Sequence, residues 1–492
     1  MKASAAQLVF PAFQFGKHDP ALAERLTDLG VGGFCLYRGT PREIRAFTAR
    51  LQKRARAPLL FAADYEDGLA SHVPGGTHFP SNMALGAAGR EDLARLKARV
   101  TAREARALGV RWIFAPVLDL ATRADNPIVN VRSFGEAPRL ASRLGRAYGD
   151  AMRAEGALAC AKHFPGHGDT RKDSHLELPT VPGSAAALRA RELAPFAAAA
   201  EAAGSVMLAH LMVPALDAKL PVPFSEKIVG GLLRGRMGYR GLVVTDALDM
   251  KAVAGRFPEV EAAARALRAG ADILLVPADP EALARALPAL ASRDAELSRR
   301  VADSLARLER AKRSCRLFAD GGKPAGSLSL VGCSAHRKAA RRVAKAALTW
   351  AGEPVRLEGT AAYLEPGTRP ARWAGAAFVD ELRAAGVDVR PYRPGAPGTV
   401  VAGAFLSPRA YSGRIALEPG AARELSRVLR GGRPGVLAAF GSPFVLDAVP
   451  GWSSALCAFS PCEESQRAAA RLLARGLRAP GRMPVSLPAR KS

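Results

Sequence analysis

Three of the eight histidines of the chain lie within fourteen residues, in the stretch KHFPGHGDTRKDSH at 162–175. Asp173 and His175 are two residues apart there, so in an extended segment their side chains face the same side. A carboxylate beside an imidazole fixes its tautomer and raises its basicity, and the imidazole can then donate and take back a proton. The stretch indicates acid–base chemistry, with a metal site and a plain polar loop as alternatives.

A metal site in this stretch would use its nitrogen and oxygen donors: His163, His167, Asp169, Asp173 and His175. The lysines and the arginine among the same fourteen residues would repel a cation. The chain also has neither an HExxH motif nor an HxH pair at the start of an apolar run. We therefore expect no metal and no other cofactor.

Asp246 is a further candidate, because it follows an apolar run in VVTDALDM at 243–250. A carboxylate at the end of a strand, in a partly desolvated pocket, can act as a nucleophile. The same residue could also bind a metal or cap a helix. Its immediate neighbours in the sequence do not decide among these roles.

Eight short apolar runs must position these residues. They lie at 6–13, 31–37, 58–66, 112–120, 157–166, 205–214, 241–250 and 271–278. Continuous apolar runs are typical of strands buried on both faces of a parallel sheet, and the segments between them, such as 91–109, have helical spacing. This alternation predicts an α/β fold of the (β/α)8 TIM-barrel type. An open doubly wound sheet is the alternative, but no GxGxxG follows an early run.

Polar residues fall at a consistent place, where an apolar run ends. They are Asp64, Asp119, Lys162, His163, His210 and Asp246. In a barrel of this type the C-terminal ends of the strands form the active-site face. We therefore expect these side chains to meet at one rim.

A stretch rich in glycine, proline and charge at 313–327 interrupts the pattern. We place a catalytic barrel domain at 1–315, a linker at 316–328 and a second, smaller α/β domain at 329–492. The apolar runs of the second domain are SLSLVG, GTVVAGAFL, GVLAAFGSPF and SALCAFS, and they alternate with helical stretches.

The net charge of +26 raises the possibility of a polyanionic partner. The basic residues are spread along helices, however, and do not form tracts with interleaved aromatics, so we expect no nucleic-acid partner. No run approaches the roughly 18 apolar residues that span a bilayer, so no membrane partner is expected either. We interpret the N-terminal MKASAAQLVFPAFQFG as a first strand. None of the six cysteines forms a CxxC pair, which favours a reducing, cytoplasmic compartment.

Two motifs together carry a family resemblance. KHFPGHGDTRKDSH followed by TDALDM resembles glycoside hydrolase family 3, in its β-N-acetylhexosaminidase branch. Four shorter motifs agree and lie in the right order: ADYEDG at 63–68, FAPVLDL at 114–120, NPIVNVRSFG at 126–135 and AHLMVPALD at 209–217. The second domain resembles the C-terminal α/β sandwich of the family through FGSPF at 440–444 and GRMPVSLP at 481–488.

The resemblance implies a retaining exo-β-N-acetylglucosaminidase that acts on cell-wall (peptidoglycan) fragments or chitooligosaccharides. Asp246 matches the nucleophile, which forms a covalent glycosyl–enzyme. His175 matches the acid/base of this branch, and Asp173 matches its partner. Most retaining glycosidases use two carboxylates instead, and a mobile loop can carry an acid in for the first step and then admit water.

The resemblance also implies a set of substrate-binding residues. Lys162 and His163 match contacts to sugar hydroxyls. Asp64 matches a carboxylate that binds distal hydroxyls of the terminal sugar, and Arg132 matches an arginine at the same sugar. Charged hydrogen bonds to hydroxyls are strong and orienting.

One motif departs from the family pattern. Where DQEGGRVQR is usual, this chain has DYEDGLASH at 64–72. Leu69 stands where an arginine is common, and His72 stands where a sugar-contacting arginine is common. The pocket should be less basic there, and the preference for a substrate is affected more than the type of reaction.

Three alternatives remain beside the leading hypothesis. A phosphorolytic β-N-acetylglucosaminide phosphorylase is one, because a histidine acid/base repels an incoming phosphate less than a glutamate would. A β-glycosidase of another sugar specificity is the second. A sugar-binding barrel protein without catalysis is the third, although it would need a lost nucleophile or acid, and Asp246 and His175 are both present.

Overall fold

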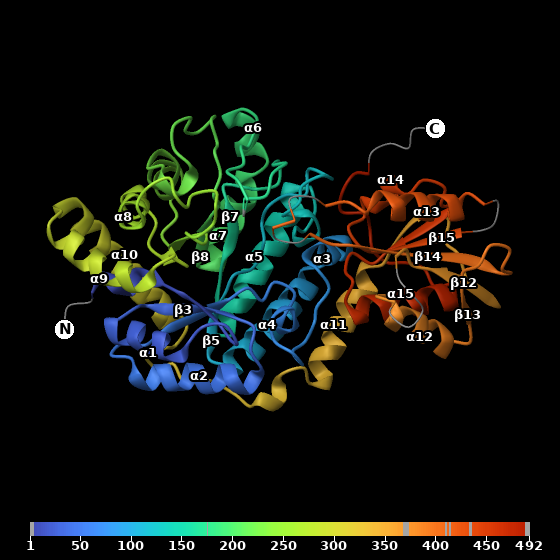
Figure 1. Ribbon diagram of the computed structural model, residues 1–492, viewed down its shortest axis with the longest axis horizontal. Coiled ribbons are helices and arrows are strands. Elements are labelled where there is room, and N and C mark those ends of the chain that lie inside the picture. The colour runs from blue at the N-terminus through green and yellow to red at the C-terminus, as the bar shows by residue number, and fades with distance from the viewer. Residues whose placement is uncertain are drawn as a thin grey trace.

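Short buried strands alternate with helices over the first 315 residues (Figure 1). The computed structural model describes residues 4–174, 176–367, 373–408, 411–412, 415–431 and 435–487. The strands of this region are β1 (Val9–Phe10), β2 (Ala12–Gln14), β3 (Gly33–Tyr37), β4 (Leu60–Ala63), β5 (Val110–Ile113), β6 (Leu158–Ala159), β7 (Ala161–Phe164), β8 (Ser205–Leu208), β9 (Leu242–Thr245) and β10 (Leu274–Leu275).

Each of the eight apolar runs contains strand residues, and all strand pairs in this region are parallel. The pairing gives a five-stranded sheet β2-β3-β4-β5-β6, a three-stranded sheet β7-β8-β9 and the pair β1-β10. Isolated parallel bridges also join Val117 to Lys162 and Val244 to Ile273. This part of the chain is therefore an α/β fold with parallel sheets.

The run expected at 112–120 overlaps its strand only in part. β5 begins at Val110 and ends at Ile113, and the following residues contribute a single bridge. Pro116 interrupts the run, because proline has no N–H to donate to a strand ladder. The segment beyond Pro116 becomes a loop, and Asp119 lies on it.

Amphipathic helices cover these strands. The main ones are α1 (Pro20–Leu29), α2 (Pro41–Arg54), α4 (Glu91–Ala107), α5 (Pro138–Ala154), α7 (Leu193–Ala203), α8 (Glu259–Ala269), α9 (Pro280–Ser292) and α10 (Ala295–Ser314). Side chains cap the starts of α1, α2, α9 and α10. In α2, Thr40 and Glu43 form a reciprocal capping box, and proline occupies the first turn. Small residues bring helices close together, since a Cβ on Gly149 of α5 would lie 2.7 Å from the backbone carbon of Ala202 in α7.

The segment after α10 is held to the strands by one buried arginine. Arg111 of β5 donates from Nη1 to the carbonyl of Cys315 at 2.6 Å, and from Nη2 to Asp320 at 2.6 Å and to the carbonyl of Lys323 at 2.8 Å. Further on, the run SLSLVG was expected as one of the apolar runs of a sheet. It forms a 3-10 turn instead, η6 (Leu328–Leu330), in which no residue is buried.

The remaining chain forms a second sheet of six strands in the order β11-β16-β15-β14-β12-β13. All its pairs are parallel except β11 with β16. The strands are β11 (Thr349–Gly352), β12 (Thr360–Leu364), β13 (Asp388–Pro391), β14 (Thr399–Leu406), β15 (Gly435–Gly441) and β16 (Ser454–Cys457).

Helices pack on both faces of this second sheet (Figure 1). Alternate residues of β14 point to opposite faces, so Val400 and Ala402 belong to one apolar cluster and Val401 to another. The first cluster includes residues of α13 (Pro419–Leu429) and α14 (Val445–Ala448). The second includes residues of α12 (Ala376–Ala384) and α15 (Glu463–Arg475).

Helix α11 (Ser334–Ala347) links the two regions, because its buried residues pack partly with the first core and partly with the second sheet. Within the described residues, none of the helices is both long enough and apolar enough to cross a membrane.

Candidate active site

A cavity of about 760 Å³ opens where the parallel strands end. Six of the eight site residues expected from the sequence line it: Asp64, His72, Arg132, Lys162, His163 and Asp246. The second sheet supplies the other wall, through segments that follow β14 and β16: Ser407, Pro408, Tyr411, Ser460 and Pro461. Polar side chains from segments far apart in the sequence therefore share one cavity.

Lys162 is anchored by two carboxylates. Its Nζ lies 2.7 Å from Oδ1 of Asp64 and 2.6 Å from Oε1 of Glu66, and only 3% of its side chain is exposed. Burial alone would lower the pKa of Lys162, but the two carboxylates outweigh burial and raise the pKa above its usual value. Lys162 is the second residue of β7, so it lies within the strand and not at its end as expected.

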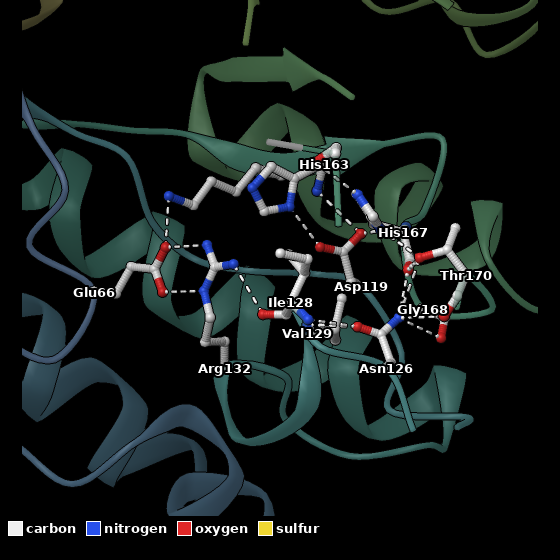
Figure 2. Close-up of polar contacts among 12 residues, drawn as sticks. Glu66, Asp119, Asn126, Ile128, Val129, Arg132, His163, His167, Gly168 and Thr170 are labelled. Carbon is white, nitrogen blue, oxygen red and sulfur yellow. Dashed lines mark hydrogen bonds and ion pairs between the residues drawn. The ribbon is translucent and has the colours of Figure 1, made fainter. Parts of the chain in front are cut away.

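Glu66 also binds Arg132 (Figure 2). Nε of Arg132 donates to Oε2 at 2.9 Å and Nη2 donates to Oε1 at 2.7 Å, while Nη1 donates to the carbonyl of Ile128 at 3.0 Å. Burial alone would raise the pKa of Glu66, but the charges of Arg132 and Lys162 hold it well below its usual value. The bidentate pair fixes the guanidinium plane at the cavity wall.

Asp119 orients His163 and the start of the following loop. Its Oδ2 lies 2.6 Å from Nδ1 of His163, and its Oδ1 accepts the backbone N–H groups of His163 at 3.1 Å and His167 at 2.7 Å. Burial alone would raise the pKa of Asp119, but these contacts outweigh it and lower the pKa. A carboxylate can only accept, so Nδ1 of His163 carries the hydrogen and its tautomer is fixed.

Asp246 follows β9 directly and is half-buried at the cavity. Its Oδ1 accepts the backbone N–H of Ala247 at 2.8 Å. Burial alone would raise the pKa of Asp246, but His210, His163 and that hydrogen bond outweigh burial and lower the pKa below its usual value. The side chain is therefore an ionised carboxylate at neutral pH, as a nucleophile requires.

The loop after β7 carries the expected acid–base pair. Asp173 is buried but does not line the cavity, whereas the next residue, Ser174, does. His175 lies outside the described residues, so its contact with Asp173 stays a prediction. Asn126, which is fully buried, holds the loop by donating from Nδ2 to the carbonyls of His167, Gly168 and Thr170 (Figure 2).

His72 also lines the cavity, at the end of a short 3-10 turn, η2 (Leu69–Ser71). Its ring centroid is 6.2 Å from that of Tyr37 and 6.4 Å from that of Tyr65. Leu69, the other departure from the family motif, is fully buried and supplies no polar atom to the cavity.

Sequence reasoning passed over three residues at this site: Glu66, Asn126 and Tyr411. Asp64 and Glu66 are two residues apart after β4, so their shared orientation was a signal that both face the cavity. Asn126 and Tyr411 act across long sequence separations and gave no local signal. No group of three or more histidine, cysteine, aspartate or glutamate side chains could hold a metal ion among the residues that the structure covers.

Comparisons with known proteins identify the family of the chain. The model of the glycosyl hydrolase family 3 N-terminal domain matches residues 2–311. A β-N-acetylglucosaminidase/β-glucosidase of Cellulomonas fimi is 35% identical over 407 residues, which cover 77% of this chain and 72% of that protein. A β-hexosaminidase of Alkalilimnicola ehrlichii is 38% identical over 264 residues, 51% of this chain and 75% of that protein.

One solved structure matches almost the whole chain. A family 3 β-N-acetylglucosaminidase from Paenibacillus sp. has a TM-score of 0.86 and 30% identity, with 99% of both chains covered. The chain therefore belongs to glycosyl hydrolase family 3, a family of glycoside hydrolases. This confirms the resemblance drawn from the two motifs and the prediction that the chain is a glycosidase.

Proposed function

We propose that the chain is a retaining exo-β-N-acetylglucosaminidase that removes terminal β-linked GlcNAc from cell-wall fragments or chitooligosaccharides. The observation that carries the proposal is the Asp246 carboxylate, set at a strand end in a cavity with paired cations and an oriented histidine. The names of the relatives from Cellulomonas fimi and Paenibacillus sp. support the choice of sugar.

The proposed reaction has two steps. An oxygen of Asp246 forms a bond to the anomeric carbon as the bond to the leaving oxygen breaks, and His175 donates a proton to that oxygen. His175 then takes a proton from water as the water oxygen bonds to the anomeric carbon and Asp246 is released. Asp173 orients His175. The acid/base role of His175 rests on the sequence motif.

The other residues of the cavity bind the terminal sugar in this proposal. Asp64, Lys162 and His163 contact its hydroxyls, and Arg132 and His72 contact the same sugar. The anchored position of Lys162 supports its role, because a cation already held by two carboxylates loses little conformational entropy on binding.

We also propose that the parallel strands close into one (β/α)8 barrel. β1 pairs with β10, the bridge from Val244 to Ile273 joins β9 to the segment before β10, and a single residue separates β6 from β7. These contacts support a continuous ring of parallel neighbours. The proposed domain limits are a barrel at 1–315, a linker at 316–328 and an α/β sandwich domain at 329–492.

The proposed setting is the cytoplasm, with a small carbohydrate as the substrate. All six cysteines lie within the described residues and none forms a disulfide; five of them are buried. Free buried thiols fit a reducing compartment.

Kinetics on nitrophenyl glycosides of GlcNAc, GalNAc, glucose and xylose tests the proposal. We expect the highest kcat/KM on the GlcNAc substrate. Assays with and without phosphate separate hydrolysis from phosphorolysis, because only a phosphorylase yields the sugar 1-phosphate. If the chain turned over only the glucoside, the proposed substrate would be wrong. A β-glucosidase activity, the second one named for the Cellulomonas fimi relative, would take its place.

A further inference from the structure

The hydrogen bonds of His167 define its tautomer. Thr170 Oγ1 donates its single hydrogen to the carbonyl of His167 at 3.0 Å, so the same oxygen accepts from Nδ1 of the ring at 2.7 Å. With the hydrogen on Nδ1, Nε2 is an acceptor. Ser174 Oγ, at 3.1 Å, therefore donates to Nε2. Burial lowers the pKa of His167 to about 4, which keeps the ring neutral at working pH.

The backbone of His167 is fixed as firmly as its ring (Figure 2). Its N–H donates to Asp119 at 2.7 Å and its carbonyl accepts from Asn126 at 2.9 Å. Asn126 is held in turn, because its Oδ1 accepts the backbone N–H groups of Ile128 and Val129 at 2.9 and 2.8 Å. The ring and backbone of His167 are thus held at a fixed position, from which Nε2 can position a neighbouring segment.

That neighbour is the short turn that begins at Asp173. The carbonyl of Asp173 accepts the N–H groups of Leu176 at 2.9 Å and Glu177 at 3.1 Å. The contact of Lys172 with Glu177 is an exposed ion pair, a kind that contributes little to stability. The bond from Ser174 to His167 is buried, and it joins this turn to the rigid part of the loop.

We propose that His167 is a positioning residue for acid catalysis, and that its Nε2 holds Ser174 and thereby orients the neighbouring Asp173, the proposed partner of the acid/base. Ser174 lies between Asp173 and His175 in the chain and lines the cavity. The inference rests on the proposed function, because it acts through the assigned acid–base pair. His167 itself does not exchange a proton with the substrate.

Ser174→Ala tests this role, because it removes one hydroxyl and leaves His167 in place. We expect kcat/KM for chitobiose, whose leaving group needs a proton, to fall about tenfold, the order of one lost hydrogen bond. We expect kcat/KM for 2,4-dinitrophenyl GlcNAc, whose leaving group needs none, to stay within about twofold of wild type. Ser174→Thr keeps the hydroxyl and should restore chitobiose hydrolysis.

Ser142→Ala is the matched control, since its hydroxyl donates to the carbonyl of Pro138 within α5. An equal fall on both substrates, or no fall on chitobiose, would overturn the positioning role. His175→Ala, measured in parallel, tests the proposed function separately. If His175→Ala shows leaving-group dependence and Ser174→Ala does not, only the role of His167 is wrong. If His175→Ala shows none, both proposals are wrong.

Discussion

Nζ of Lys162 lies 2.6 Å from Oε1 of Glu66, and the same carboxylate binds Arg132 through two hydrogen bonds. One partly buried glutamate thereby contacts two cations, one from a strand and one from a 3-10 turn. The cations in turn neutralise its charge, so the three side chains are stable only as a group. We therefore expect a substitution of Glu66 to affect substrate binding as if both Lys162 and Arg132 had been altered.

Glu66→Gln should lower kcat/KM by a factor of about 10 to 100, because charge-assisted bonds to two cations are weakened and each contributes about 1.5–3 kcal/mol. The effect should fall mainly on KM if Lys162 and Arg132 bind the ground-state sugar. Glu91→Gln is the control, since Glu91 pairs with Arg95 and Arg143 on the surface. Wild-type kinetics for Glu66→Gln would contradict the positioning of the two cations.

Asp119→Asn should reduce both stability and activity. The amide keeps one acceptor but presents an N–H group where Nδ1 of His163 now donates. We expect a loss of about 1–3 kcal/mol in the free energy of unfolding, because a buried hydrogen-bonding group loses its partner, and a lower kcat. Urea denaturation and steady-state kinetics measure the two effects. Asp150→Asn, which alters an exposed pair with Arg153, should change the stability by less than about 1 kcal/mol.

Tyr411 should contribute to binding of the leaving-group sugar, because it reaches the cavity from the second sheet and 64% of the residue is exposed. For Tyr411→Ala we expect KM for chitobiose to rise about fivefold, the order of one aromatic contact. The inhibition constant of free GlcNAc should not change. Tyr411→Phe keeps the ring and should behave as wild type. An equal effect on chitobiose and GlcNAc would place Tyr411 at the terminal sugar instead.

Lys312 should make stability depend on pH. Burial lowers its pKa in the folded protein from 10.5 to about 7. Between these values the unfolded chain binds a proton that the folded protein does not, so stability rises with pH by up to about 1.4 kcal/mol per unit. Lys312→Met should remove this dependence. Between pH 7 and 10.5, its gain in the free energy of unfolding over wild type should be largest near pH 7. Exposed Lys345→Met should leave it intact, and parallel curves for wild type and Lys312→Met would contradict the prediction.

The strands of the first region could be predicted because they are buried on both faces. Such strands have nearly continuous apolar runs, and Asp64 and Asp246 follow their strands directly as the rule of strand ends requires. The same rule misplaced Lys162 and His163, which lie inside β7. The apolar run SLSLVG was misread for a related reason, because apolar residues without a neighbouring strand can form a turn instead.

The arrangement within the site was harder to predict. Asn126 contacts residues more than 40 positions away, and the contact between Glu66 and Arg132 spans 66 positions. Such contacts depend on how strands are ordered and loops are closed, which local patterns do not report. The family motifs located the candidate residues, but the pairing of Lys162, Arg132 and Glu66 required the structure.

The central claim is that Asp246 is the nucleophile of a retaining glycosidase. Asp246→Ala should abolish turnover of 2,4-dinitrophenyl GlcNAc while the inhibition constant of GlcNAc remains measurable. Added azide should then restore the release of dinitrophenol, because the small anion can enter the space left by the carboxylate. NMR of the sugar product should show the α-glycosyl azide, as displacement at the nucleophile's face requires. Wild-type turnover by Asp246→Ala, or rescue that yields the β-azide, would contradict the assignment.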